Sequence, residues 1–334
     1  VNTTSSAKIV TYTITPTGPS PTFCVGDPIN ASVTVNPKPG ISQKASDICN
    51  NTAFSITPLD GQNGDIVPVG TTYTWTVVPN ANVTGWSDQP VAQSSISQTL
   101  TNNSLTLQNV EYLVTPKSGD CTGNPFTVKV TVNPTPNVTA TPSTQIICSG
   151  SATNIGLSTT ITGVTVLYRW TAAITSAPAG GTITGFSNCN TNACGSNIAQ
   201  TLTNTGTSPG IVRYTVTPRI GSCTGTPVTV DITVNPAPQV NNPGTQVVCN
   251  QENLSVSFST NRTGGTTTYG WTNNNTTIGL AGSGIGNIGT FTATNTTNAP
   301  VSATLQVTPT YQNTSGGPTC TSNAQSFIIT VNPT

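Results

Sequence analysis

Only 5% of the 334 residues are charged, where soluble domains typically have about 25%. Nine Lys and Arg balance nine Asp and Glu, so no net field attracts nucleic acid or an anionic membrane. The chain has no His, which removes the commonest proton shuttle near neutral pH and the commonest zinc ligand. We therefore expect no enzyme, and no catalytic, cofactor-binding or metal-binding residues.

A closing motif recurs four times, at intervals of 97, 102 and 97 residues. Each copy ends a strand such as Phe126–Val132 or Val228–Val234, in which every second residue is apolar. This alternation predicts one face in a core and one in water. The Asn-Pro that follows ends the strand, because proline donates no ladder hydrogen bond. The four copies are Val35-Asn36-Pro37, Val132-Asn133-Pro134, Val234-Asn235-Pro236 and Val331-Asn332-Pro333.

A second strand precedes each closing strand, and a Gly-rich turn with one Cys lies between the two, which predicts a hairpin. An aromatic strand lies earlier in each full repeat and carries Trp75, Trp170 or Trp271. Because these residues hold the same position in every repeat, we expect core tryptophans rather than a carbohydrate-stacking platform. The second strands are Val10–Pro16, Val110–Pro116, Val212–Pro218 and Ala303–Pro309.

Short strands in units of about 100 residues predict an all-β fold of tandem immunoglobulin-like sandwiches. The paired prolines near each boundary predict stiff connectors and an extended array. Residues 1–37 supply only the C-terminal part of a preceding repeat, and three complete repeats follow, at 38–134, 135–236 and 237–334.

The nine cysteines fall into sets by repeat position. Early cysteines are Cys49, Cys148 and Cys249, whereas the late hairpins carry Cys24, Cys121, Cys223 and Cys320. Cys189 and Cys194 form an extra local pair. The absence of Cys-x-x-Cys spacing and of His argues against zinc and favours disulfides in an oxidising exterior.

Two pairing schemes fit these positions. Pairs within repeats leave Cys24 unpaired, and pairs across junctions leave Cys320 unpaired. From Cys121 the closing strand runs roughly 35 Å if extended before Cys148 follows in the next repeat, but a disulfide needs Cα atoms about 4.4 to 6.8 Å apart. We therefore expect the scheme within repeats, namely Cys49 with Cys121, Cys148 with Cys223, and Cys249 with Cys320.

The sequence also contains three weaker motifs. Gly284–Gly289 matches a dinucleotide-binding string but lacks a following helix, so we expect a loop. Asp60–Asp65 offers oxygen side chains in a tight turn, where calcium is an alternative to a solvated loop. Asn-x-Ser/Thr triplets at Asn82, Asn137 and Asn295 match glycosylation acceptors, but the abundance of Asn and Thr explains most of them by chance.

Five segments of the first full repeat carry a resemblance to a known family, namely Tyr73–Val77, Ser95–Leu100, Val114–Pro116, Cys121–Gly123 and Phe126–Pro134. They resemble the PKD-like repeats of large Bacteroidota surface proteins. That family includes gliding-motility adhesins exported by type IX secretion, so the resemblance implies a secreted protein of the bacterial cell surface. It carries no catalytic residues to transfer, and the acidic signature of the founding PKD repeats is absent.

The leading hypothesis is a non-enzymatic repeat region of a large surface adhesin or filament, which acts as a stalk and a polar adhesive surface. Its expected partners are neighbouring repeats of the same long chain, surface polysaccharide, and other copies in a filament. One alternative is an accessory spacer or carbohydrate-binding module of a secreted glycan-degrading enzyme. Another is a structural filament subunit completed by strand exchange.

Overall fold

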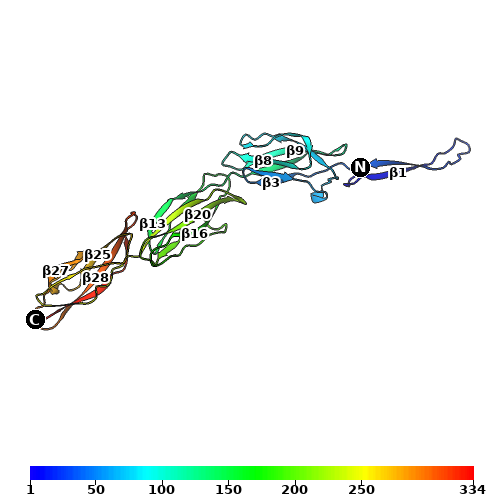
Figure 1. Ribbon diagram of the computed structural model, residues 1–334. Helices are drawn as coiled ribbons and strands as arrows, with labels where there is room; N and C mark the ends of the chain where they lie inside the picture. Colours follow the sequence, from blue (N-terminus) through cyan, green and yellow to red (C-terminus); the bar gives the residue numbers. More distant parts are fainter. The chain divides into compact units, whose positions relative to one another are not determined.

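A computed structural model describes residues 1–334 (Figure 1). It confirms the all-β class, because its only helices are the single 3₁₀ turns η1 (Gln62–Gly64) and η2 (Thr276–Ile278). None of these helices is long and apolar enough to cross a membrane. The chain forms two compact units. The first comprises residues 1–137, 160–166 and 219–225, and the second comprises 138–159, 167–218 and 226–334.

The first full repeat is a sandwich of two sheets. One sheet has the order β3-β11-β9-β5-β7, with β10 on β9, and the other has the order β4-β8-β6. Burial alternates along β11, as its apolar pattern predicts. The bounds are β3 Lys44–Ile48, β4 Thr52–Ile56, β5 Thr72–Val78, β6 Val83–Thr84, β7 Gln89–Gln93, β8 Ile96–Asn102, β9 Gln108–Ser118, β10 Cys121–Thr122 and β11 Phe126–Val132.

The N-terminal hairpin joins β1 (Lys8–Ile14) to β2 (Ile29–Val35) in continuous antiparallel register. Its sequence matches that of β9 and β11, yet its side chains are almost all exposed. Tyr12 is 57% exposed, whereas its counterpart Tyr112 is fully buried. The difference arises because no second sheet covers this hairpin.

The second full repeat has a sheet of order β13-β22-β20-β16, with β21 on β20, and two short sheets, β12-β15-β18 and β14-β19-β17. Its core includes Val212, Tyr214 and Val216, which are fully buried on alternate positions of β20. The bounds are β12 Thr139–Thr141, β13 Thr144–Cys148, β14 Ser151–Ala152, β15 Ile155–Ser158, β16 Leu167–Ser176, β17 Ile183–Thr184, β18 Asn197–Ile198, β19 Thr201–Asn204, β20 Gly210–Ile220, β21 Cys223–Thr224 and β22 Val228–Asn235.

The third full repeat has a sheet of order β23-β30-β28-β25-β26, with β29 on β28, and the pair β24-β27. Its core is built around Phe258, Tyr269 and Phe327, whose rings pack together. The bounds are β23 Gln246–Cys249, β24 Asn253–Val256, β25 Gly265–Asn273, β26 Ser283–Ile285, β27 Ile288–Thr292, β28 Val301–Asn313, β29 Cys320–Thr321 and β30 Gln325–Asn332.

In every full repeat an early strand runs parallel to the closing strand. β3 pairs with β11, β13 with β22, and β23 with β30. The register places Cys148 opposite Asn235 and Cys249 opposite Asn332. Each early cysteine therefore lies at the end of its repeat where the closing strand finishes, and its own late hairpin lies at the start of that strand.

Candidate functional site at the joints between repeats

Two disulfides link neighbouring repeats at equivalent positions. Cys49 follows β3 and is bonded to Cys223, in the late hairpin of the next repeat, with Cα atoms 5.3 Å apart. Both cysteines belong to the first compact unit. Cys148 is bonded to Cys320 of the third repeat across 5.5 Å, inside the second unit. Each early cysteine thus binds the late hairpin of the repeat that follows.

The expected scheme, with pairs within repeats, is wrong for these cysteines, and so is the alternative with pairs across junctions. Within the first repeat, the parallel pairing of β3 with β11 sets Ile48 opposite Val132. Phe126 lies at the other end of β11, about 20 Å away at roughly 3.3 Å per residue, and Cys121 precedes it. That separation exceeds the reach of a disulfide, so Cys49 cannot bond to Cys121. The next repeat supplies the hairpin that approaches Cys49.

The remaining cysteines divide into one local pair and three thiols. Cys189 and Cys194, the expected local pair, are bonded to each other. Cys24 is a free thiol, and so are Cys121 and Cys249, which were expected to be bonded. Cys121 and Cys249 do not bond to their expected partners, because the early cysteine and the late hairpin lie at opposite ends of one repeat.

A group of polar contacts accompanies the disulfide between the second and third repeats. Asn235 is fully buried, and its Oδ1 accepts a hydrogen bond of 2.6 Å from Nδ2 of Asn313. Its Nδ2 lies 3.7 Å from Sγ of Cys320. Arg262 Nε donates to the carbonyl of Ala237 at 2.7 Å, and its Nη1 donates to that of Gly206 at 3.1 Å. Paired polar groups of this kind fix the orientation of a joint.

The tryptophans expected in the core are buried. Trp75 and Trp170 are each 5% exposed, and Trp271 is 7% exposed. The indole Nε1 of Trp75 donates to the carbonyl of Ser87 at 3.2 Å. Its ring faces are therefore not available as a surface for stacking sugars.

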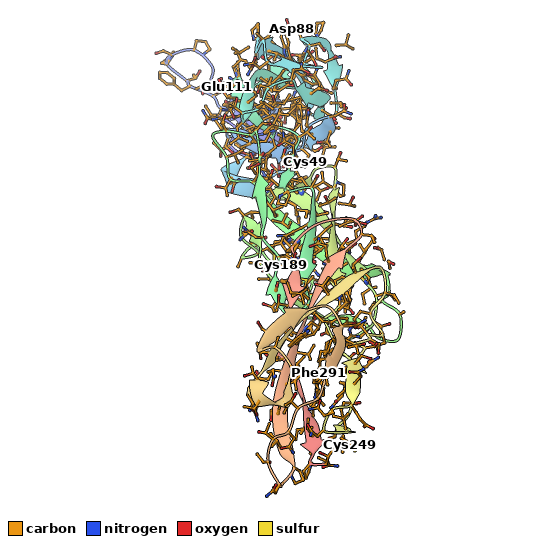
Figure 2. The ribbon with its side chains drawn as sticks, turned by 90° about the vertical axis from the view of Figure 1, so that its left-hand side faces the viewer. Cys49, Asp88, Glu111, Cys189, Cys249 and Phe291 are labelled. Carbon is orange, nitrogen blue, oxygen red and sulfur yellow. A yellow bond between two sulfur atoms is a disulfide. The ribbon has the colours of Figure 1, made fainter.

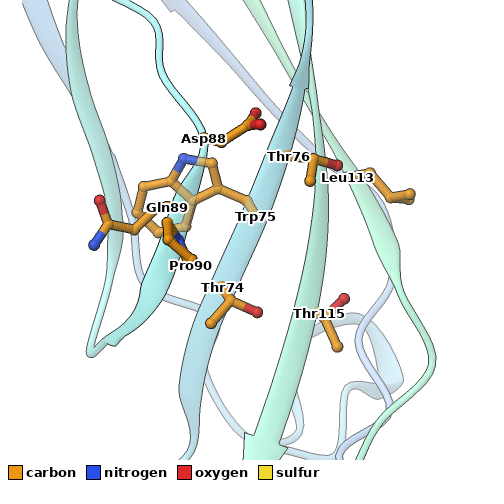
Figure 3. A pocket seen from close by; sticks show the side chains of 8 residues that line it. All are labelled: Thr74, Trp75, Thr76, Asp88, Gln89, Pro90, Leu113 and Thr115. Carbon is orange, nitrogen blue, oxygen red and sulfur yellow. The ribbon is translucent and has the colours of Figure 1, made fainter.

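A surface hollow of about 480 Å³ lies beside Trp75 over β5, β7 and β9 (Figure 3). Its single ionisable side chain, Asp88, accepts a hydrogen bond of 2.8 Å from the backbone N–H of Val77. The hollow therefore lacks the pair of titratable groups that general acid-base chemistry uses. Its lining is Thr74, Trp75, Thr76, Asp88, Gln89, Pro90, Leu113 and Thr115.

In the turn considered for calcium, both aspartates already have hydrogen-bond partners within the chain. Asp65 is 3% exposed and binds Lys44 Nζ at 2.5 Å and the N–H of Ser42 at 2.8 Å. Burial raises the pKa of Asp65, but these hydrogen bonds and the Lys44 charge outweigh burial and hold it below its ordinary value. Asp60 accepts from the N–H of Val67 at 2.9 Å. One carboxylate is thus already neutralised by a cation of the chain.

A buried asparagine recurs in all three full repeats, at Asn102, Asn204 and Asn295, and the sequence pattern did not reveal it. In each case Nδ2 donates to the carbonyl of the last valine of the closing strand, at 2.8 to 2.9 Å. Oδ1 accepts from the N–H two residues on. Asn295 had matched a glycosylation triplet, but its side chain is 5% exposed and holds the turn together.

A second repeated network links Gln and Tyr in the first two full repeats. Tyr112 donates to Oε1 of Gln98 at 3.0 Å, and Tyr214 donates to Oε1 of Gln200 at 2.8 Å. Gln98 Nε2 also donates to the carbonyl of Ser87 at 2.8 Å. Each network satisfies a buried phenol in the core.

The comparisons with solved structures give only distant likenesses. Drosophila N-cadherin EC1-4 is 12% identical over 99% of this chain and 84% of that chain, with a TM-score of 0.26. Sidekick-1 immunoglobulin domains 1-4 are 9% identical over 98% and 94%, with a TM-score of 0.28. The complex of Dpr2 Ig1-Ig2 with DIP-Theta Ig1-Ig3 is 11% identical over 89% and 99%, at 0.34.

The family comparison is stronger. The PKD-like domain family matches residues 1–39, 46–136 and 145–238, which is more than half of the chain. No curated protein matches. The combination of disulfides and PKD-like repeats indicates an extracellular protein, and this fold is typically non-catalytic. The chain belongs to the PKD-like domain family.

Proposed function

We propose that the chain is a non-enzymatic stalk region of a bacterial cell-surface adhesin, and that its disulfides let it resist tension. The observation that carries the proposal is the overlap of the two joint disulfides. Cys49–Cys223 spans 174 residues and Cys148–Cys320 spans 172, and each span contains one end of the other. Most of the chain between Cys49 and Cys320 is therefore bypassed by covalent bonds.

The overlap limits how far the chain can be stretched. The shortest covalent path between the termini runs through residues 1–49, 148–223 and 320–334. This path extends to about 500 Å at most, and the whole reduced chain to about 1,200 Å, at roughly 3.6 Å per residue. Even when the sandwiches unfold, the disulfides therefore limit the extension of the stalk to less than half of that of the reduced chain.

Single-molecule pulling between the two termini tests the proposal. We expect the oxidised chain to stop near 500 Å and the same molecule in reductant to reach about 1,200 Å. A Cys24→Ser variant is the matched control, because Cys24 is a free thiol whose loss should leave both lengths unchanged. Equal lengths with and without reductant would refute the stalk mechanism.

The adhesive part of the proposal rests on surface chemistry and on the sequence resemblance. With 5% charged residues, the exposed faces offer mainly hydroxyl and amide groups, which suit a neutral polysaccharide. The proposed partners are neighbouring repeats, surface polysaccharide and other copies in a filament. Attachment through many weak contacts would be strengthened by repetition along the stalk. Gliding motility and type IX secretion are part of this proposal through the resemblance alone.

A further inference from the structure

The free thiol of Cys249 occupies the position that forms a joint in the two preceding repeats. β23 runs parallel to β30 and places Cys249 opposite Asn332, as β13 places Cys148 opposite Asn235. Figure 2 shows Cys249 at the end of the third repeat. Cys148 in the same setting is bonded to the late hairpin of another repeat.

Burial separates the bonded cysteines from their unbonded counterparts. In the late hairpins, the bonded Cys223 and Cys320 are 4% and 1% exposed, whereas the unbonded Cys121 is half-buried. Among the early cysteines, Cys49 and Cys148 are half-buried in their bonds, whereas Cys249 is exposed. Both unbonded positions thus lack the cover that a neighbouring repeat gives the others.

An apolar residue beside Cys249 lacks the same cover. Ile146 lies two residues before Cys148 and packs against Gly317 of the third repeat, where an added Cβ would come within 2.7 Å of Ile146 Cγ2. Val247 holds the equivalent place before Cys249 and is 62% exposed. The contact that accompanies a joint is therefore also missing at Cys249, independently of the sulfur.

We propose that Cys249 is the attachment site for the late hairpin of a further PKD-like repeat joined after Thr334. Cys121 is the complementary site, which takes the early cysteine of a repeat placed before the first one. The connector supports this occupant, because Val331–Thr334 has the same sequence as Val132–Thr135, which leads into the second repeat. This inference rests on the proposed structural role of the repeats.

Formation of such a joint is a two-electron oxidation. The two thiols lose two protons and two electrons as the new S–S bond forms. A disulfide oxidant such as oxidised glutathione accepts the electrons, and its own S–S bond breaks to give two thiols. The exchange begins with attack by one thiolate on the oxidant, and the second thiolate then resolves the mixed disulfide.

The test extends the full chain after Thr334 with a copy of residues 136–236, followed by oxidation with glutathione disulfide. Non-reducing peptide mapping should link Cys249 to the Cys223 of the copy, a pair that the unextended chain does not contain. Titration should find three free thiols, as in the unextended chain. Five thiols, with Cys49–Cys223 and Cys148–Cys320 intact, would overturn the inference.

A Cys249→Ser change in the extended chain is the matched control. It should raise the number of free thiols to four, because the Cys223 of the copy then lacks its partner. A reciprocal variant replaces residues 1–37 with the same copy and should link Cys121 to the Cys148 of the copy. It keeps the test decisive where the C-terminal extension does not fold. Free thiols at both Cys249 and Cys121 would refute the proposed attachment sites but not the proposed stalk function. The stalk function is tested separately, by the pulling lengths of the unextended chain.

Discussion

Asn295 joins three backbone groups inside the third repeat. Its Nδ2 donates to the carbonyls of Val331 and Ala299, each at 2.9 Å, and its Oδ1 accepts from the N–H of Thr297 at 2.9 Å. Asn295→Ala removes all three partners. The hydrogen bond to the Val331 carbonyl is buried, and a buried group left without a partner costs about 1 to 3 kcal/mol. We expect the unfolding transition of the third repeat to move to clearly lower urea concentration, as followed by Trp271 fluorescence.

Asn298→Ala is the matched control for that experiment. Asn298 is exposed and lies only three residues further along the chain. A surface change of this kind shifts stability by no more than about 0.5 kcal/mol. Equal urea midpoints for the two variants would contradict the structural role assigned to Asn295.

The buried tyrosines make stability fall at alkaline pH. Burial raises the pKa of Tyr73 and of Tyr214 to about 12 from an ordinary value of 10.0, and Asp65 adds to the shift at Tyr73. The folded state therefore holds these protons more tightly than the unfolded chain. The stabilisation is fully present below pH 10 and is lost as pH rises through 12.

Thermal unfolding measured from pH 8 to pH 12, with the free thiols alkylated to prevent disulfide exchange, checks this. The melting temperature should decline above pH 10, and absorbance at 295 nm should show the buried phenols ionising together with unfolding. A Tyr214→Phe variant should lose part of the alkaline decline. Ionisation of all tyrosines near pH 10 in the folded protein would contradict the assignment.

The core tryptophans were predictable from the sequence, but the buried asparagines were not. Trp75, Trp170 and Trp271 repeat within an alternating apolar strand, a pattern with one common physical cause. Asn295 lies in an Asn-Thr-Thr triplet, which is equally compatible with a turn, a glycan acceptor and chance. Only the three-dimensional turn shows that its amide faces inward.

At the scale of elements, one sequence pattern occurs in two environments, in the hairpin β1–β2 and in the pair β9–β11. Both are antiparallel in continuous register. β9 and β11 lie in a covered sheet, whereas a lone two-stranded hairpin is marginally stable in water. We expect backbone amides of β1 and β2 to exchange with deuterium much faster than those of β9 and β11, as measured by mass spectrometry.

The exchange of β9 and β11 is the internal control for that of β1 and β2, because both hairpins belong to one molecule at one pH. Deletion of residues 1–35 should leave the exchange of β9 and β11 unchanged, since their core does not include the N-terminal hairpin. Slow exchange of β1 and β2 in the monomeric chain would mean that another surface covers them.

The hairpins were predictable because they are local, and the cysteine pairing was not because it is long-range. Alternation and a Gly-rich turn place β9 beside β11 from nearby residues alone. The parallel pairing of β3 with β11 brings together residues more than 80 positions apart. No turn motif in the sequence indicates that pairing, although the pairing determines at which end of the sandwich Cys49 lies.

At the scale of the whole molecule, the low charge predicts little response to salt. Only two ion pairs were found, Lys44–Asp65 and Arg213–Asp231. The first is buried and so is poorly screened, and the second is partly exposed. Between 0.02 and 0.5 M NaCl we expect the free energy of unfolding to change by no more than about 1 kcal/mol. A larger change would require charge clusters that the structure does not show.

Reduction should loosen the joints and leave the sandwiches folded. The cores of the first and third repeats contain no cysteine, so their packing does not depend on the disulfides. Cys148–Cys320 instead ties two repeats whose direct connector is the short segment after Asn235. We expect the double variant Cys148→Ser/Cys320→Ser to keep its far-UV circular dichroism and to be cut faster by protease near residues 236–245.

Cys189→Ser/Cys194→Ser is the control for this last experiment, because it removes a disulfide that closes a separation of 5 residues within one repeat. Its connector after Asn235 should be cut at the rate of the unmodified chain. Loss of β-structure in the first variant would show that the repeats need the joint in order to fold. Intact sandwiches with a more accessible connector would instead mean that the disulfides fix the geometry between domains that are already stable, as a stalk requires.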